Sequence, residues 1–311
     1  MPSQNPVKTE HILVLGAGEL GLCVLRELAT HVANGTAASL TVLLRASTVA
    51  SSDPSKRAEL NALHALGVEI LQADLINDSV EDLGRHFGGF DTVISCVGFV
   101  AGAGTQRKLA QAVLEAGVKR YVPWQFGVDY DVIGRGSPQD LFDEQLDVRD
   151  LLRAQRTTEW LIISTGMFTS FLFEPVFGVV DLAHNTVHAL GGWDTRVTVT
   201  TPEDIGTLTA AILFAEPRLA NQVVFVAGDT LSYGQLADTL DTVLDRQLAR
   251  VAWDVPLLER RLAAAPEDQM SKYRAVFAQG RGVAWDKRDT FNGAHGMELT
   301  KAAAWIEQNL K

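Results

Sequence analysis

Short apolar runs alternate with longer amphipathic segments along the first half of the chain. Six runs are predominantly apolar, as strands buried on both faces are; they cover residues 11–15, 40–44, 68–72, 92–97, 120–124 and 160–165. Between them lie segments with apolar residues three and four positions apart, at 19–33, 55–66, 79–87, 104–117 and about 140–155. This alternation predicts βαβ units and therefore an α/β fold with a doubly wound parallel sheet.

The pattern changes after Gly166, where aromatic residues, glycine and proline become dense over 167–178. This stretch is too irregular for a central strand and favours the wall of a pocket. Extended segments with a turn at Asn185 and another at 191–192 are expected next, followed by a helix that begins near Thr201. A last strand at 222–228 and helices at about 232–246, 255–264, 267–279 and 300–309 complete the prediction.

No repeat or linker separates the two halves of the sequence. We therefore expect a nucleotide-binding type of domain over 1–165, to which segments within about 195–230 return. A smaller, closely packed domain over 166–311 is expected to form the substrate pocket.

Composition and charge narrow the class of protein. Of the 311 residues, 47% are hydrophobic, and the net charge of −11 disfavours a general nucleic-acid-binding role. Cys23 and Cys96 fall in segments predicted to be buried, so neither a disulfide framework nor a thiolate metal site is indicated. The first ten residues lack the apolar core of a signal peptide, and no apolar run reaches the roughly 18 residues of a membrane span. We expect a cytoplasmic protein with no membrane or nucleic-acid partner.

A glycine-rich turn joins the first predicted strand to the first helix, with the G-x-G-x-x-G spacing. Gly16 permits a tight turn, Gly18 lets a pyrophosphate approach the main chain, and Gly21 lets helix and strand pack closely. The N–H groups at the helix start, around Glu19 and Leu20, face the anion. In this βαβ setting the motif predicts a Rossmann-type dinucleotide site; the alternative is an ordinary tight turn.

The end of the second predicted strand indicates which nicotinamide cofactor the site takes. An acidic residue there binds the ribose 2′-hydroxyl and repels a 2′-phosphate, whereas this chain has Arg45. A guanidinium pairs well with a dianionic phosphate, and Ser47 adds a hydroxyl donor nearby. The sequence therefore favours NADP(H) over NAD(H), unless Arg45 only solvates the strand end.

Further candidates follow the third and fourth predicted strands, because an open α/β sheet binds its ligand at the carboxyl ends of its strands. They are Asp74, Leu75, Ser95, Cys96, Val97 and Gly98. Turn capping by Asp74 and chain reversal at Ser95 and Gly98 are equally open readings. No histidine lies near Cys96 in sequence to activate it as a nucleophile.

The order and spacing of these segments resemble the NmrA-like and isoflavone reductase-like family of atypical short-chain dehydrogenases. The likeness rests on the glycine loop, Arg45 and the segments 104–131, 164–168, 201–206 and 227–238, and it covers most of the chain. In the family's reductases the stretch after the fifth strand commonly reads Pro-Ser-Glu-Phe-Gly, and residues 123–127 here read Pro-Trp-Gln-Phe-Gly. The resemblance implies that Phe126 flanks the nicotinamide and that Gln106 matches a family glutamine near the cofactor.

The chain departs from that family where its reductases carry a lysine that donates or accepts a proton. Aligned on Val148 and Arg149, this position is Gln145, and no lysine occurs between Lys119 and Lys272. A neutral amide does not relay protons at physiological pH, so general acid–base catalysis, worth roughly 10²- to 10⁴-fold, needs another group.

Other residues are fallback candidates for that proton transfer. The usual short-chain dehydrogenase dyad is missing, because no lysine follows Tyr121 or Tyr130 at four residues. Tyr130, Asp143 and Glu144 remain, against the alternative that the two carboxylates are solvated helix charges.

A substrate pocket is expected from the aromatic stretch after Gly166. Its predicted wall residues are Phe126, Met167, Phe168, Phe171 and Phe173. Plain core packing explains about half of them equally well. His184 and His188 are four residues apart, but a turn lies between them and no supporting carboxylate or cysteine pattern is present, so we expect no metal site.

From these features we expect an NADPH-dependent reductase that acts on a small apolar or aromatic carbonyl or enone. The rival is a redox-sensing regulator like the NmrA branch of the family, which binds the dinucleotide without turnover and acts on a protein partner; Gln145 favours it. Such a sensor must distinguish the oxidised from the reduced state by binding free energy. A structural pathway partner that keeps only the fold is a third, weaker reading. The substrate and the oligomeric state stay open.

Overall fold

The computed structural model describes residues 10–311 and divides into two compact units. The first unit comprises the chain up to Trp124 together with Asp147–Ile162 and Ile205–Val223. The second comprises Gln125–Leu146, Ile163–Asp204 and Val224–Lys311. Residues 1–9, on which the expected absence of a signal peptide mainly rests, lie outside the described residues, and the domain limits drawn from sequence stay a prediction.

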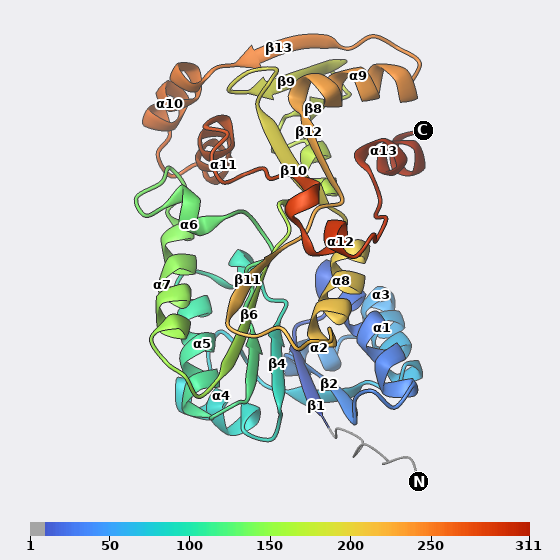
Figure 1. The fold of residues 1–311 in the computed structure, drawn as a ribbon, viewed down its shortest axis with the longest axis vertical. Coiled ribbons are helices and arrows are strands. Elements are labelled where there is room, and N and C mark those ends of the chain that lie inside the picture. Colours follow the sequence, from blue (N-terminus) through green and yellow to red (C-terminus); the bar gives the residue numbers. More distant parts are fainter. Residues whose placement is uncertain (1–9) are drawn as a thin grey trace. The chain divides into compact units, whose positions relative to one another are not determined.

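A seven-stranded sheet forms the frame of the first unit (Figure 1). Its strands are β1 (His11–Leu15), β2 (Ser39–Leu44), β3 (Glu69–Gln72), β4 (Thr92–Ser95), β5 (Arg120–Val122), β6 (Glu159–Ser164) and β11 (Gln222–Phe225). They lie in the order β11-β6-β5-β4-β1-β2-β3, and the pairs from β3 across to β6 are parallel. The predicted Rossmann-type sheet is confirmed.

The strand order reverses beside β1, and this reversal places the site. β1 pairs with β2 on one side and β4 on the other, with Leu15 opposite both Leu43 and Ser95. The loops that leave β1 and β4 therefore diverge to opposite sides of the sheet. In open α/β sheets, ligands bind in the crevice at such a point, beyond the carboxyl ends of the strands.

Helices cover both faces of this sheet (Figure 1). They are α1 (Glu19–Ala33), α2 (Ala46–Val49), α3 (Pro54–Ala65), α4 (Val80–Phe87), α5 (Thr105–Glu115), α7 (Leu141–Arg153) and α8 (Pro202–Leu213), with a 3-10 turn, η1, at Phe99–Ala101. Buried residues of α4, α5 and α7, among them Phe87, Leu109 and Val148, share one core cluster with the strands. On α8, Gly206 lies so close to α1 that an added Cβ atom would be 2.7 Å from the main chain of Cys23.

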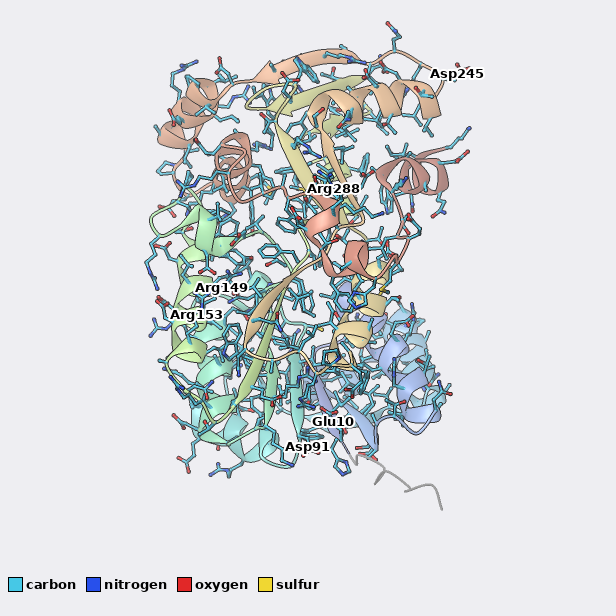
Figure 2. All side chains as sticks on the ribbon, viewed as in Figure 1. Glu10, Asp91, Arg149, Arg153, Asp245 and Arg288 are labelled. Atoms are coloured by element: carbon cyan, nitrogen blue, oxygen red, sulfur yellow. The ribbon has the colours of Figure 1, made fainter. Side chains whose placement is uncertain are left out.

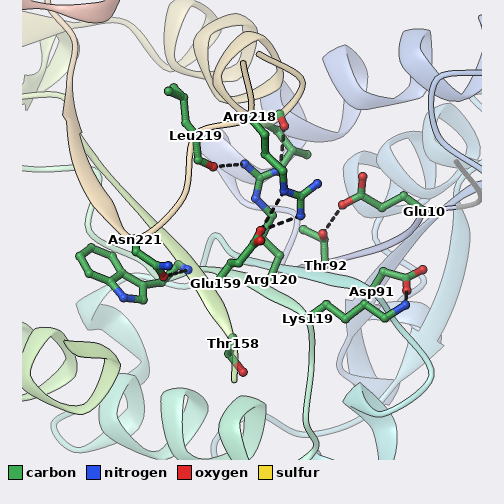
Figure 3. Close-up of polar contacts among 12 residues, drawn as sticks. Glu10, Asp91, Thr92, Lys119, Arg120, Thr158, Glu159, Arg218, Leu219 and Asn221 are labelled. Atoms are coloured by element: carbon green, nitrogen blue, oxygen red, sulfur yellow. Dashed lines mark hydrogen bonds and ion pairs between the residues drawn. The ribbon is translucent and has the colours of Figure 1, made fainter. Parts of the chain in front are cut away.

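A buried arginine on β5 fixes the segment that returns to the first unit (Figure 3). The Arg120 side chain is fully buried and donates to the carbonyl oxygens of Leu213 and Leu219, each at 2.7 Å. Burial lowers the pKa of its guanidinium to about 10, with neighbouring Arg218 as a second cause. Arg218 itself pairs with Glu159 at 2.7 Å nearer the surface.

Replacing Arg120 by methionine is expected to lower the free energy of unfolding by about 2–4 kcal/mol, because one buried and one partly buried carbonyl oxygen lose their charged donor. Arg218→Met, which removes a half-exposed ion pair, should cost less than about 1 kcal/mol. Denaturant unfolding of both variants measures the difference. Equal losses would show that the buried contacts of Arg120 carry no special weight.

The second unit contains two small sheets. One has the order β12-β10-β7, made of Asp229–Ser232, Arg196–Thr200 and Met167–Phe168; the other has the order β13-β9-β8, made of Ala249–Trp253, Thr186–Leu190 and Val180–Asp181. Its helices are α6 (Tyr130–Ile133), α9 (Tyr233–Val243), α10 (Val255–Ala264), α11 (Gln269–Ala278), α12 (Phe291–Ala294) and α13 (Ala302–Leu310), with 3-10 turns η2 (Thr169–Phe173) and η3 (Lys287–Asp289).

Local sequence signals explain where several of these helices begin. Ser232 and Gln235 form a reciprocal capping box at the start of α9. Asp254, followed by a helix with proline in its first turn, caps α10 through the N–H of Leu257 at 2.8 Å. The predicted helix 255–264 therefore has the bounds that the structure gives.

Candidate functional site

The glycine loop after β1 adopts the geometry that its spacing predicts. Gly16 has φ of +88°, a conformation that costs a residue with a side chain energy. A Cβ atom on Gly21 would lie 2.3 Å from the Gly16 carbonyl oxygen, so only glycine fits there. Gly18 is different, because an added Cβ atom would meet no atom of the described residues within 4 Å. Two glycines are thus required by the fold, and the third faces open space.

Gly18 is also the N-cap of α1, and none of the residues that the structure describes caps the helix there with a side-chain hydrogen bond. The N–H groups in the first turn of a helix have no partner within the helix and carry a partial positive charge. An uncapped helix start with open space before it suits an anion such as a pyrophosphate.

A cavity of about 320 Å³ opens beside this loop within the first unit; we call it the β1–β2 cavity. Residues from the glycine loop, the end of β2, one face of α3 and the turns after β3 and β4 line it. They are Gly16, Ala17, Gly18, Leu43, Leu44, Arg45, Thr48, Lys56, Glu59, Leu60, Leu63, Leu75, Ile76, Val97 and Ala101.

The cavity brings together five of the residues predicted for the cofactor, namely Gly16, Gly18, Arg45, Leu75 and Val97. Ser47 is exposed on α2 and, among the residues described, Thr48 rather than Ser47 lines the cavity. Arg45 is the N-cap of α2, so the residues after it follow a helical turn. Three residues after Arg45, Thr48 therefore lies on the same side of the chain as Arg45, whereas Ser47, two residues after it, does not.

Sequence reasoning missed Lys56, which adds a second cation to this cavity. It lies in the first turn of α3, whose start Asp53 fixes by accepting from the Lys56 N–H at 3.0 Å. Its ammonium pairs with Glu59 at 2.9 Å. The Asp-Pro pair at 53–54, soon after Arg45, marks the start of a helix in the sequence. The sequence does not show which face of that helix packs toward the strands, so the position of Lys56 could not be predicted.

Asp74 shapes the turn after β3. Its carboxylate accepts hydrogen bonds from the main-chain N–H groups of Ile76 and Asn77 and from the Asn77 side chain, at 2.8 to 3.1 Å. These bonds, first of all the one from the Asn77 side chain, lower the pKa of Asp74, and nearby Arg45 lowers it further. Lys108 donates to the Ile76 carbonyl at 2.7 Å. Asp74 thus holds the turn that presents Leu75 and Ile76 to the cavity.

The residues after β4 differ in what they face. Ser95 is fully buried. Cys96 is buried too, and desolvation raises the pKa of its thiol, which disfavours the thiolate. At Gly98, a Cβ atom would lie 3.0 Å from the Trp124 ring. Of this stretch, Val97 lines the β1–β2 cavity.

Gln106, on α5, holds the loop that follows β4. Its side chain is buried and its amide nitrogen donates to the Val97 carbonyl oxygen at 2.8 Å. Gln106 therefore fixes the main chain of Val97, a residue that lines the cavity.

Glu19 and Leu20 begin α1 next to Gly18; the Glu19 side chain is exposed and the Leu20 side chain is buried.

Gln145 lies on α7 in the second unit and is fully buried. Neither its amide nitrogen nor its amide oxygen has a hydrogen-bond partner among the residues described, whereas its main-chain carbonyl accepts from the Gln125 side chain at 2.9 Å. Arg149 lies one turn later on the same helix (Figure 2). Its side chain is also fully buried. A buried amide without hydrogen-bond partners lowers the free energy of unfolding, so such groups are rare in native proteins.

The fallback acid–base candidates are set in different surroundings. Tyr130, at the start of α6, is buried with its ring edge-on to Phe142, 5.0 Å between centroids. The Asp143 carboxylate accepts from the Gly136 N–H at 3.0 Å and so closes a surface loop, while Glu144 is half-buried. The chain also brings Lys272 of α11, nearly buried, to within 2.9 Å of Asp140.

The predicted pocket residues divide between core and partly open positions. Phe126 and Met167 are buried, whereas Phe168 and Phe171 are half-buried. Phe171 packs on Phe177 at 4.7 Å and on Tyr273 at 5.9 Å between ring centroids, and Tyr273 packs in turn on Phe142. Burial raises the pKa of Tyr273 to about 12.

The two histidines considered as metal ligands have other partners. His184 hydrogen-bonds Asp181 at 2.7 Å, and His188 stacks on Trp253 and bonds the Gly178 carbonyl. Across residues 10–311, no cluster of three or more His, Cys, Asp or Glu side chains could hold a metal ion. Within the same part of the chain, none of the helices is both long enough and apolar enough to cross a bilayer.

Comparison with known proteins relates this chain to one family. The model of the NmrA-like family matches residues 8–285. An NmrA-like family domain-containing oxidoreductase of Gibberella moniliformis is 48% identical over 96% of this chain and 98% of that protein. Eugenol synthase 1 of Petunia hybrida is 28% identical over 83% of this chain and 82% of its own length.

Solved structures share the fold. An isoflavone reductase superposes with a TM-score of 0.78 and 20% identity, covering 97% of this chain and 99% of that one. The binary complex of leucoanthocyanidin reductase with NADPH from Vitis vinifera gives a TM-score of 0.71 and 21% identity over 89% of each chain.

Proposed function

The chain belongs to the NmrA-like family, and from this membership and the β1–β2 cavity we propose that it is an NADP(H)-dependent oxidoreductase. The observation that carries the proposal is the pairing of an uncapped, open helix start at Gly18 with two cations, Arg45 and Lys56, in one cavity. The helix start suits the pyrophosphate, and the cations suit the 2′-phosphate of adenosine.

The substrate is proposed to be a small aromatic or otherwise apolar carbonyl or enone. Support comes from the half-buried Phe168 and Phe171 of the second unit and from the relatives named as reductases, such as the isoflavone reductase homolog P3 of Arabidopsis thaliana. The cofactor would supply the hydride when bound. This chain's residues would bind and orient the nicotinamide and exclude water from it.

The experiment is NADPH oxidation followed against a panel of aldehydes, quinones and enones. Turnover above the background rate with at least one class, and a preference for NADPH over NADH, is the expected result. Tight NADPH binding without turnover across the panel would contradict the enzyme and leave the cofactor assignment in place.

A redox sensor is the second candidate, and one observation favours it. The position aligned with the family's catalytic lysine is Gln145, an amide that cannot relay a proton at neutral pH. A sensor would bind NADP⁺ and NADPH with different affinities and pass that difference to a protein partner. Calorimetric titration with each form, together with the panel above, separates the two candidates.

Gln145→Met tests what the buried amide does. Its nitrogen and oxygen lack hydrogen-bond partners within residues 10–311, so an apolar side chain of similar volume is expected to raise the free energy of unfolding by about 1–2 kcal/mol. If Gln145 contacts the substrate or nicotinamide, turnover or ligand affinity falls in the same variant. Functional sites often keep residues that lower the stability of the fold.

Gln125→Met is the matched control, since it removes the donor to the Gln145 carbonyl and should lower stability. Unfolding curves and NADPH titrations on both variants give the answer. A destabilised Gln145→Met protein would mean that the amide is satisfied after all.

A further inference from the structure

One carboxylate, that of Glu59, lines the β1–β2 cavity beside the two cations. Lys56, Glu59, Leu60 and Leu63 lie three and four residues apart and place one face of α3 along the cavity. The Glu59 carboxylate is 2.9 Å from the Lys56 ammonium, and the side chains are 32% and 49% exposed, so both are partly open to solvent.

A dianionic 2′-phosphate and the Glu59 carboxylate compete for the same ammonium. To bind Lys56, the phosphate must displace or share this ion pair, and it then lies within a few ångströms of a like charge. Even in bulk water, two unit charges about 4 Å apart interact strongly enough to change affinity about fivefold, and the effect is larger near a protein surface. A ribose 2′-hydroxyl has the opposite relation to Glu59, because it is a donor and a carboxylate is an acceptor.

We propose that Glu59 is a specificity-determining residue that limits the preference for NADP(H) and keeps binding of NAD(H) within reach, an inference that rests on the proposed function. Arg45 and Lys56 favour the 2′-phosphate, and Glu59 on the same wall opposes it. The chain therefore has a weaker coenzyme preference than its two cations alone would give.

Glu59→Gln tests this inference, because it removes the charge and keeps the size. The dissociation constants of NADPH and NADH are measured by fluorescence or calorimetry for the wild type and the variant. The ratio of the NADH to the NADPH constant is expected to rise about tenfold at low salt, mainly through tighter NADPH binding, and less at high salt, where charges are screened. Glu81→Gln, at an exposed i,i+4 pair with Arg85, is the matched control and should change nothing.

A ratio within twofold of the wild type, or one that falls, overturns the role of Glu59. Arg45→Ala in the same titration separates this failure from that of the proposed function. If Arg45→Ala weakens NADPH binding while Glu59→Gln has no effect, only the inference about Glu59 fails. If the wild type binds neither coenzyme, the proposed function fails with it. Thermal unfolding of each variant shows that the fold is kept, since partly exposed ion pairs contribute little to stability.

Discussion

Replacing Gly18 by alanine is expected to weaken binding of both NADPH and NADH about 100-fold and to leave the stability of the protein unchanged. The new methyl group meets no atom of residues 10–311 within 4 Å, so the folded chain accepts it. It instead occupies the open space before α1, where we propose that the pyrophosphate approaches the main chain. A 100-fold loss corresponds to about 2.7 kcal/mol of binding free energy.

Gly21→Ala is the contrasting variant. Its methyl group would lie 2.3 Å from the Gly16 carbonyl oxygen, so the loop must shift and the free energy of unfolding must fall. Calorimetric titration and thermal unfolding of the two variants test the difference. A Gly18→Ala protein that binds NADPH as tightly as the wild type would show that the dinucleotide does not use this loop.

Arg45→Ala is expected to weaken NADPH binding about 30- to 100-fold and to change NADH binding less than threefold. The reason is that a guanidinium forms charge-assisted bonds with a phosphate, each worth roughly 1.5–3 kcal/mol, whereas the 2′-hydroxyl of NADH needs none. Arg45 is exposed at the mouth of the cavity, so the fold should tolerate the change.

The matched control for Arg45→Ala is Arg57→Ala, an exposed arginine of α3 that is not among the described residues lining the cavity. Its NADPH and NADH constants should equal those of the wild type. Equal losses of NADPH affinity in the two variants would indicate a general effect of surface charge rather than recognition of the 2′-phosphate.

Long periodic segments of the sequence predicted the frame of the first unit well. The helix 19–33 has the predicted bounds because its apolar residues repeat at the helical period over the whole element. The strand 11–15 has them because its apolar run is continuous and ends directly before Gly16. The strands predicted at 92–97 and 120–124 end earlier, at Ser95 and Val122. Their last apolar residues leave the sheet to form the loops at its carboxyl edge, which local hydrophobicity does not reveal.

Short elements of the second unit were the least predictable. The strands β7 and β8 are two residues long, too short to show an alternation of apolar and polar residues. They are defined only by their pairing with β10 and β9. Strand β13 pairs in parallel with β9, about 60 residues earlier in the chain, and is mostly exposed, so it lacks the apolar alternation that marks a strand.

The candidate site was predictable where a backbone motif defines it and not where side chains from distant elements meet. The glycine loop and Arg45 follow from spacing next to a strand. Lys56 and Glu59 reach the same cavity from α3, and their place depends on the rotation of that helix against the sheet. The unpartnered state of the Gln145 amide is a property of packing and leaves no trace in the sequence.

Calorimetric titration of NADPH into the wild-type protein beside Gly18→Ala tests the proposed dinucleotide site most directly. We expect saturable binding of one NADPH per chain to the wild type, in the micromolar range or tighter, and affinity about 100-fold weaker for the variant. No binding heat with the wild type at millimolar NADPH, at more than one temperature, would contradict it.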